Sequence, residues 1–394
     1  MAVCQGEIKD VVMAMQDELI KFAQNIVQIQ SYSSHEGKLA KFIQMKMNEL
    51  GYDEVYIDST GNVVGRVGNG PVSIMFDSHM DTVEVNDPEK WKEPPFSGNI
   101  ADGRLYGRGA VDMKAALASS VFAAAAAKRV GIPDSCTVYV TCTVNEEDCD
   151  GRNLEHLFAE KKIVPDYYVT CEPSSNEIAL GHTGKAMVEI HTKGVSAAAC
   201  RPFNGVNAVY KMADIIKRVN ALNEKLSAVE GEHGTVTLSN ITCETASLNA
   251  VPSGCTICLD RRMVLGETEA QVRQEMDELV AGTDATWEIL TITATSWTGS
   301  EIVYHPFHEA WQIDPEHKLT RTMLNAYQDV FGKEHGPFHK WLGGSNAVTP
   351  VALGVPSIGF GPGEDFLSHV SNESCNVEEI VKACEFYTTV IETL

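Results

Sequence analysis

The first half of the chain alternates between segments with the hydrophobic spacing of helices and short apolar runs. Near the N-terminus, apolar side chains recur at the helical period: Val11, Val12, Met15, Leu19, Phe22, Ile26 and Val27. Ser33 and Glu36 have the spacing of a capping box, which predicts a second helix to about Leu50. Apolar runs follow at 54–58, 62–67 and 72–77, a helix with an alanine run at 113–130, and strands at 137–144 and 166–171. This alternation predicts an α/β sheet with helices on both faces.

The hydrophobic pattern changes near Lys185. We predict a strand at 185–193, a helix at 206–225, strands at 235–242 and 255–263, a helix at 268–281 and a strand at 287–294. This β-α-β-β-α-β order is that of a ferredoxin-like unit. After Trp297 the earlier pattern resumes, with a helix at 316–331, a strand at 356–360 and a final helix at 377–393. We therefore expect an α/β/α domain at 1–183 and 298–394, interrupted by a ferredoxin-like (βαββαβ) domain at 184–297.

Length and charge narrow the class of protein. A chain of 394 residues favours two domains, and 44% hydrophobic with 22% charged residues is an ordinary globular balance. The net charge of −23 argues against a nucleic-acid partner, because phosphate binding needs a basic surface. The sequence shows no apolar stretch of roughly 18 residues, so we expect no membrane span.

Cysteine usage and the N-terminus indicate a reducing compartment. The 11 cysteines are irregularly spaced in a large chain, which argues against a disulfide framework. Cys255 and Cys258 lack the second pair that a zinc ribbon needs, so we expect both to be structural. The first residues lack a basic start followed by an apolar core, which argues against a secretory signal. We therefore expect a cytoplasmic protein.

Residues that can bind metals follow several of the predicted strands. His79 and Asp81 come after the run at 72–77, and residues two apart in an extended chain point the same way. Later members of this set follow other strands or lie in loops: Asp112, Glu146, Glu147, Glu172 and His369. Because ligands bind at the carboxyl ends of the strands in open α/β sheets, we expect these side chains to converge.

The donor types narrow the kind of metal site. Two histidines with several carboxylates exclude a thiolate site and fit a pair of zinc ions, with manganese or cobalt as alternatives. A two-metal site needs a bridging carboxylate and a free carboxylate as base. The neighbouring Glu146 and Glu147 offer a base and a ligand from one turn.

In this order and spacing, these residues resemble the metal signature of the zinc aminoacylase, acetylornithine deacetylase and glutamate carboxypeptidase family of dinuclear metallohydrolases. The resemblance covers essentially the whole chain. It implies that Asp112 bridges two metal ions, that His79 and Glu172 hold one ion, and that Glu147 and His369 hold the other. It also implies that Asp81 orients His79 and that Glu146 is the general base toward a metal-activated water.

The same resemblance implies a fold, a substrate class and an assembly. The fold is a large mixed-sheet α/β/α catalytic domain with a lid and dimerisation domain inserted. Residues expected to contact the carboxylate of an N-acyl amino acid or small dipeptide are Asn249, Arg262, Gly344, Ser345 and Asn346. A homodimer through the lid also agrees with the exposed edge strand of its sheet. The segments 145–151, 259–262 and 359–363 resemble in particular the selenium-metabolism-linked hydrolases.

One position departs from the family pattern. Ala198 stands where the family carries a lid histidine that polarises the scissile carbonyl. Losing one such donor costs on the order of 10²–10³ in turnover. Arg201 and His182 are candidate substitutes. The alternatives left open are a catalytically impaired protein that binds metal and ligand, and hydrolysis of another C–N bond such as a carbamoyl group or cyclic amide.

The remaining polar residues near these motifs are expected to be structural. We predict that Asp148 and Asp150 cap the loop that follows Glu147. His305 and His308 lie among charged and loop residues, so we expect them to be solvated or structural.

Overall fold

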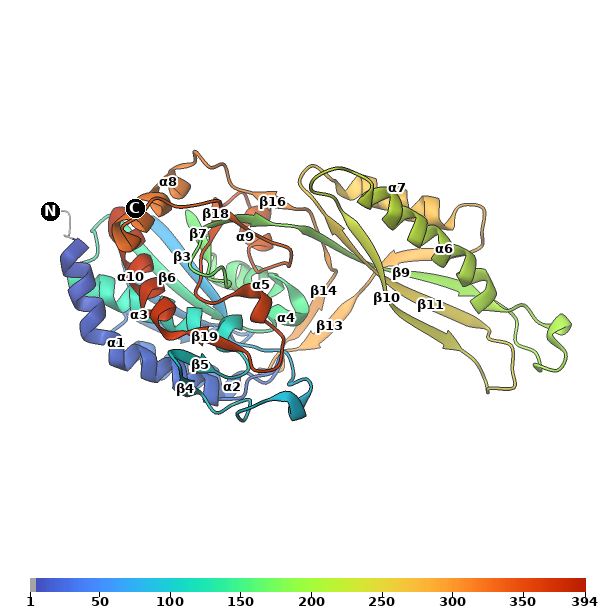
Figure 1. The fold of residues 1–394 in the computed structure, drawn as a ribbon, viewed down its shortest axis with the longest axis horizontal. Coiled ribbons are helices and arrows are strands. Elements are labelled where there is room, and N and C mark those ends of the chain that lie inside the picture. The colour runs from blue at the N-terminus through green and yellow to red at the C-terminus, as the bar shows by residue number, and fades with distance from the viewer. Residues whose placement is uncertain (1–4) are drawn as a thin grey trace.

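The computed structural model describes residues 5–394, and these form two lobes of unequal size (Figure 1). The larger lobe holds both ends of the described chain and a nine-stranded sheet, and the smaller lobe holds a five-stranded sheet. The boundaries expected at residues 183/184 and 297/298 stay a prediction.

The large sheet is mixed. Its strands run, in spatial order, β1 (Glu54–Ile57), β2 (Val63–Gly68), β6 (Cys136–Thr143), β3 (Val72–His79), β7 (Tyr167–Thr170), β18 (Ser357–Gly359), β8 (Ala179–His182) and β16 (Trp311–Gln312), with β17 (His339–Trp341) paired to β8. The four central strands from β6 to β18 are parallel, and β1, β2 and β16 pair antiparallel to their neighbours. The carboxyl ends of the four parallel strands therefore meet at one edge, as the sequence predicted.

Helices cover both faces of this sheet, which confirms the predicted α/β/α layering. One face carries α1 (Gln5–Gln28), α2 (Gly37–Glu49), α3 (Ala115–Val130), α8 (Lys318–Phe331) and α10 (Val377–Thr393). The other face carries α5 (Arg152–Lys161) and α9 (Val348–Ala352). In β3, Ile74 and Phe76 join the first core and Met75 joins the second. Both faces of β3 are thus apolar, which explains its continuous hydrophobic run.

The alanine-rich helix α3 is the centre of the larger lobe. Its residues from Ala115 to Ala127 are buried, because small side chains let it pack closely between the sheet and the helices α1 and α10. Residues Ala110–Val130 are long and apolar enough to meet a membrane-span criterion, which corrects the expectation that the sequence holds no such stretch. Of that hydrophobic window, 94% is buried inside the protein, as in the core helix of a globular fold.

The smaller lobe has the predicted ferredoxin-like order. Its elements are β9 (Gly184–Lys193), α6 (Ala208–Ser227), β10 (Thr235–Glu244), β11 (Gly254–Met263), α7 (Glu269–Val280) and β12 (Thr286–Ile289). The strands lie in the order β10-β11-β9-β12, each antiparallel to its neighbour, and β15 (Phe307–His308) also pairs with β9. Both helices pack on one face, around a core that includes Val188, Ile190 and Ile257. We call this lobe the lid.

Two local predictions were wrong. Ser33 and Glu36 do not form a capping box: the Ser33 hydroxyl donates to Asp81, and Glu36 accepts the backbone N–H groups of Ser34 and Asn145. The strand expected at 287–294 is two strands, because the chain leaves the lid sheet after β12. It then forms β13 (Ile292–Thr295), which pairs with β14 (Glu301–Tyr304). Short elements absent from the prediction include a small sheet of β4 (Asn99–Ala101), β5 (Arg104–Tyr106) and β19 (Ser374–Asn376).

Candidate metal centre

His79 is the last residue of β3, and its buried ring is held at both nitrogens. Nδ1 lies 2.9 Å from the backbone oxygen of Asp81 and 3.6 Å from its carboxylate. Nε2 lies 2.9 Å from Oδ1 of Asp112 and 3.9 Å from Oε1 of Glu172. The Nδ1 contact fixes the ring orientation, which leaves Nε2 directed at the carboxylates.

Asp112 stands between the two histidines of the predicted set. Its Oδ1 faces His79, and its Oδ2 lies 3.2 Å from Nε2 of His369. The buried carboxylate of Glu373 holds the Asp112 loop by accepting the backbone N–H groups of Val111 and Asp112, at 2.9 and 3.1 Å. Glu373 itself pairs with the buried Arg108 at 2.6 Å. One carboxylate oxygen toward each histidine is the arrangement that a bridging ligand requires.

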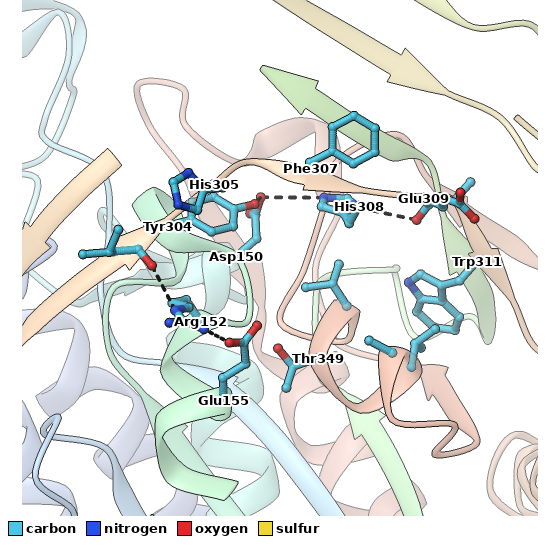
Figure 2. Close-up of a pocket in the computed structure, with 15 residues that line it drawn as sticks. Asp150, Arg152, Glu155, Tyr304, His305, Phe307, His308, Glu309, Trp311 and Thr349 are labelled. Carbon is cyan, nitrogen blue, oxygen red and sulfur yellow. Dashed lines mark hydrogen bonds and ion pairs between the residues drawn. The ribbon is translucent and has the colours of Figure 1, made fainter. Parts of the chain in front are cut away.

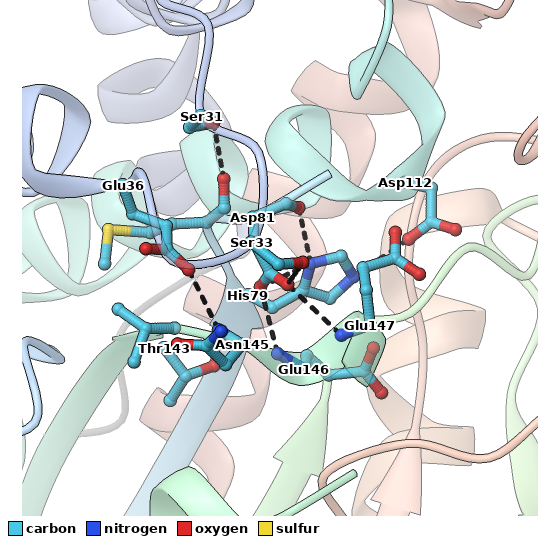
Figure 3. A network of polar contacts seen from close by, with 12 residues as sticks. Ser31, Ser33, Glu36, His79, Asp81, Asp112, Thr143, Asn145, Glu146 and Glu147 are labelled. Carbon is cyan, nitrogen blue, oxygen red and sulfur yellow. Dashed lines mark hydrogen bonds and ion pairs between the residues drawn. The ribbon is translucent and has the colours of Figure 1, made fainter. Parts of the chain in front are cut away.

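Glu146 and Glu147 open the short helix α4 (Glu146–Cys149) just beyond β6. The Asp81 carboxylate accepts their backbone N–H groups at 3.0 and 3.2 Å and the Ser33 hydroxyl at 2.7 Å (Figure 3). The side chains of both glutamates extend to the same side of the network as Asp112 (Figure 3). Asp81, expected to orient His79, therefore contacts the ring through its main chain and uses its carboxylate to anchor α4.

The remaining predicted ligands complete the cluster. Both carboxylate oxygens of Glu147 lie near Nε2 of His369, at 3.0 and 3.1 Å. Two sets of donor atoms lie within 4.8 Å of one another: His79 with Asp112 and Glu147, and His79 with Glu146 and Glu172. The structure thus brings all five predicted ligands and the predicted base into one site.

The electrostatics of this cluster call for added positive charge. Burial, followed by the charge of Asp112, raises the pKa of Glu147 to about 7. Burial also raises the pKa of Glu146 and of Glu172 well above the usual range, and neighbouring acids add to the shift. Pairing with Asp112 and Glu147 raises the pKa of His369 to about 10. Within residues 5–394, no lysine or arginine pairs with Asp112, Glu146, Glu147 or Glu172. The cluster thus lacks a compensating lysine or arginine among the described residues, and its nitrogen and oxygen donors fit borderline divalent metals such as zinc.

A pocket of about 520 Å³ opens from this cluster toward the lid. Of the residues predicted to contact substrate, Arg262 and Gly344 line it. Lys185 also lines it, at the start of the first lid strand, although no motif in the sequence marks this residue. Arg262 is held by Asp260 through two hydrogen bonds, at 2.7 and 2.9 Å. Two cations from the lid therefore face the acidic cluster.

The other three predicted substrate residues do not line this pocket. Asn249 lies in an exposed lid loop, where its backbone oxygen accepts the N–H of Ala199. Ser345 and Asn346 are buried. The Asn346 amide donates to Asp77 and Thr143 and accepts from the backbone N–H of Gly151. These hydrogen bonds hold the loop after α4 in place. The hydrogen bonds of Asn346 show a structural role, and its contact with a substrate stays a prediction.

A second cavity, of about 570 Å³, lies beside the hinge between the lobes (Figure 2). Asp150 lines both cavities. Its buried carboxylate accepts the Tyr304 hydroxyl at 2.7 Å, forms an ion pair with Lys185 and lies 3.8 Å from Nε2 of His308. Asp150 is thus the centre of a buried polar network rather than a loop cap, and His308 belongs to that network rather than to solvent.

Neither proposed substitute for the missing lid histidine reaches the pocket of its own chain. Ala198 pairs with Ala250 as an isolated backbone bridge in the lid. Arg201 is exposed and precedes a short 3-10 turn. His182 is fully buried at the hinge, where burial and then the nearby His308 lower its pKa to about 3. Within residues 5–394, the pocket therefore lacks a histidine from the lid.

Comparison with known proteins identifies the family. The sequence profile of the peptidase family M20/M25/M40 matches residues 75–393. The chain belongs to this family. An M20 assignment agrees with the converging histidines and carboxylates, and it makes the protein a metallohydrolase of amide or peptide bonds.

Individual M20 relatives match over most or part of the chain. The uncharacterised protein YgeY of Escherichia coli (strain K12) is 32% identical over 380 residues, covering 95% of this chain and 94% of that protein. A probable succinyl-diaminopimelate desuccinylase of Staphylococcus epidermidis is 29% identical over 213 residues, 53% of this chain and 52% of that protein. The crystal structure of the aminopeptidase PepT from Bacillus cereus superposes with a TM-score of 0.71 at 23% identity, covering 96% of this chain and 98% of that one. This likeness shows the same two-lobed fold.

Proposed function

We propose that the protein is a dinuclear metal-dependent amidohydrolase that cleaves the amide of an N-acyl amino acid or small dipeptide. The observation that carries this proposal is the convergence of His79, Asp112, Glu147, Glu172 and His369 beside the buried Glu146. In the proposed assignment His79 and Glu172 hold one ion, Glu147 and His369 hold the other, and Asp112 bridges them. Bound divalent ions would supply Lewis-acid polarisation of the substrate carbonyl and acidification of water.

Glu146 is the proposed general base. Its side chain lines the pocket, is 7% exposed and has no hydrogen-bonding cation among the described residues. In this role it takes a proton from the attacking water and returns it to the leaving nitrogen. The Asp81 carboxylate fixes the backbone of Glu146 and Glu147 together, so the base and a ligand keep a constant spacing.

The lid supplies the proposed recognition of a substrate carboxylate. Arg262 and Lys185 are the cations that line the pocket, and each already pairs with an acid, Asp260 and Asp150 respectively. A guanidinium can bind a carboxylate through two hydrogen bonds, so an anionic substrate would share or displace Asp260. Closure of the lid over the substrate would exclude water from the reacting groups.

The relatives agree with cleavage of a C–N bond. One is named a probable desuccinylase and a structural neighbour is an aminopeptidase, so acyl and peptidyl amides both fit. On the segments 145–151, 259–262 and 359–363, we infer further that the chain belongs to the selenium-metabolism-linked branch of the family.

Metal identity, assembly and location are also part of the proposal. Zinc is preferred because the donors are imidazoles and carboxylates, with cobalt or manganese as alternatives. A homodimer through the lid is supported by β10, an edge strand of the lid sheet on which Ile241 is 49% exposed. A cytoplasmic location is supported by the free state of every cysteine in the described part of the chain.

The direct experiment is a screen of the purified protein against N-acetyl and N-succinyl amino acids and dipeptides with zinc, cobalt or manganese added. We expect turnover that a chelator abolishes and that the same metal restores. Absence of turnover for the whole panel, with every metal, would contradict the proposed function.

A second candidate function follows from Ala198. A protein without the lid histidine could bind metal and a carboxylate ligand with impaired hydrolysis, or cleave a different C–N bond such as a carbamoyl group or cyclic amide. Tight binding of panel compounds without turnover would favour the binding protein. Turnover of N-carbamoyl or cyclic substrates alone would favour the different bond.

A further inference from the structure

The lid carries a second group of metal-capable side chains, away from the main centre. Glu189 and His191 project from β9 and Glu288 from β12, and one donor atom of each lies within 4.8 Å of the others. Glu189 and His191 are two residues apart, so they share a face of the strand. Glu288 is directly opposite Glu189 in the β9–β12 pairing. The three side chains are on the face of the lid sheet opposite Val188 and Ile190, which contact the helices.

The ring of His191 is oriented as a ligand would be. Nδ1 lies 3.0 Å from the Thr256 hydroxyl of the neighbouring strand β11. Nε2 is buried and has no hydrogen-bond partner, although it lies 3.3 Å from Oε1 of Glu288 and 3.8 Å from Oε2 of Glu189. When Nδ1 donates to Thr256, the lone pair of Nε2 faces two carboxylates. A divalent cation between the three side chains would bind to Nε2 and to both carboxylates.

The charges around His191 also favour a cation at this place. Glu189 and Glu288 form a directly opposed pair of like charges across two strands, which by itself destabilises the pairing. Neither carboxylate pairs with a lysine or arginine in the described part of the chain. The Cys258 thiol, 3.5 Å from Oε1 of Glu189, donates to that carboxylate from the next strand. The thiol thus orients the Glu189 side chain, as hydrogen-bond donors commonly do for carboxylates that bind metals.

We propose that Glu189, His191 and Glu288 bind a divalent transition-metal ion, with zinc the best match to one imidazole and two carboxylates. The ion ties β12 to β9. β12 has only four residues, is an edge strand and pairs only with β9, and the chain leaves the lid directly after it. A metal crosslink at this point stabilises the end of the lid sheet from which the chain returns to the larger lobe.

This site is separate from the main centre. Lys185, which lines the main pocket, precedes Glu189 by four residues on β9. At about 3.3 Å per residue, the two points are roughly 13 Å apart along the strand. Occupancy of one site can therefore be measured while the other is removed.

The test is a count of zinc per chain by elemental analysis of full-length protein after gel filtration. His191→Ala should lose about one ion per chain relative to wild type, because a three-ligand site without its imidazole no longer retains zinc. His233→Ala is the matched control: His233 is an exposed lid histidine whose ring is hydrogen-bonded to the backbone oxygen of Gly231. The double variant His79→Ala/His369→Ala, which lacks the main centre, should keep about one ion. That arm separates failure of this proposal from failure of the proposed function.

A second measurement covers the case in which His191→Ala folds poorly. Glu288 is 69% exposed, so Glu288→Gln should leave the fold intact. In the His79→Ala/His369→Ala background, added zinc should raise the melting temperature, and Glu288→Gln should remove that rise. An unchanged zinc count in His191→Ala, or a zinc-induced rise that survives Glu288→Gln, would overturn the proposal.

Discussion

The two cavities at the junction of the lobes are similar in size but differ in how their carboxylates are paired. The metal-centre pocket measures about 520 Å³ and the hinge cavity about 570 Å³. Every carboxylate of the hinge cavity has a donor: Asp150 has Lys185 and Tyr304, Glu155 has Arg152, and Glu309 has the backbone N–H of Glu269. In the metal-centre pocket, Asp112, Glu146, Glu147 and Glu172 lie near one another and near two histidines, and none of the four pairs with a lysine or arginine of residues 5–394. Unbalanced charge, rather than volume, therefore distinguishes the site of chemistry.

The strongest test of this contrast is to remove one acid from each cavity. Glu146→Gln should reduce kcat by about 10²–10⁴-fold, because it removes the proton acceptor without removing a proposed ligand. Metal content should stay at the wild-type value. Glu155→Gln, in the hinge cavity, should leave kcat and KM unchanged. Survival of turnover in Glu146→Gln would show that the base is misassigned.

Asp150, which lines both cavities, should contribute to the free energy of unfolding. Asp150→Asn keeps an acceptor for Tyr304 and removes the charge that Lys185 and His308 face, so we expect a loss of about 3 kcal/mol in the free energy of unfolding. Urea denaturation at neutral pH measures this, with Glu155→Gln as the control. Although burial opposes ionisation, His308 and Lys185 lower the pKa of Asp150. Its stabilising effect is thus present above the ordinary value near 4 and is lost as pH falls below it. A stability equal to that of wild type would contradict the network.

The order within the metal-centre pocket depends on Asp81. Asp81→Asn replaces one of the acceptor oxygens that hold Ser33, Glu146 and Glu147 with a donor. We expect kcat/KM or metal affinity to fall by about 10–100-fold, as for other groups that orient ligands. Steady-state kinetics and metal titration measure the two effects separately. An unchanged value for both would show that α4 keeps its position without the carboxylate.

The smallest expected effect concerns His182, which packs behind the hinge cavity. Its pKa is lowered to about 3, so between pH 6.5 and 3 the unfolded chain binds a proton that the folded chain does not. Stability should therefore fall with pH in this window, by about 2 kcal/mol at pH 5 from this group alone. His182→Asn should reduce the stability difference between pH 7.5 and pH 5 by that amount. An identical pH dependence in variant and wild type would contradict a neutral buried His182.

The main centre was predictable because the order of the parallel strands determines where most of its residues lie. Once β3, β6 and β7 are parallel neighbours, the residues that follow them, such as His79, Glu146 and Glu172, must meet at one edge of the sheet. His369 lies in the loop after the predicted strand at 356–360, and its role as a ligand was implied by the resemblance to a family. Roles that depend on the choice among several nearby partners were harder to predict.

The residues that were missed or misassigned have such ambiguous partners. Ser33 and Glu36 fit a capping box by spacing, but tertiary partners, Asp81 and Asn145, outcompete the helix end. Asn346 lies in a loop expected to contact substrate, yet its amide satisfies buried groups of the core. Lys185 belongs to no motif, and only the crossing of the chain between the lobes brings it to the pocket. Spacing along the chain cannot rank partners that are distant in sequence.

One ion pair links the lid to the segment that carries the proposed base. Lys185 begins the lid, and its partner Asp150 lies three residues after Glu147 on the same short segment as Glu146. A rotation of the lid relative to the larger lobe would therefore either move Asp150 together with Lys185 or break the ion pair. Because Asp150 lies on the segment that carries Glu146, a change in the position of the lid would also shift the proposed base, so substrate binding and the placement of the base are coupled through this pair.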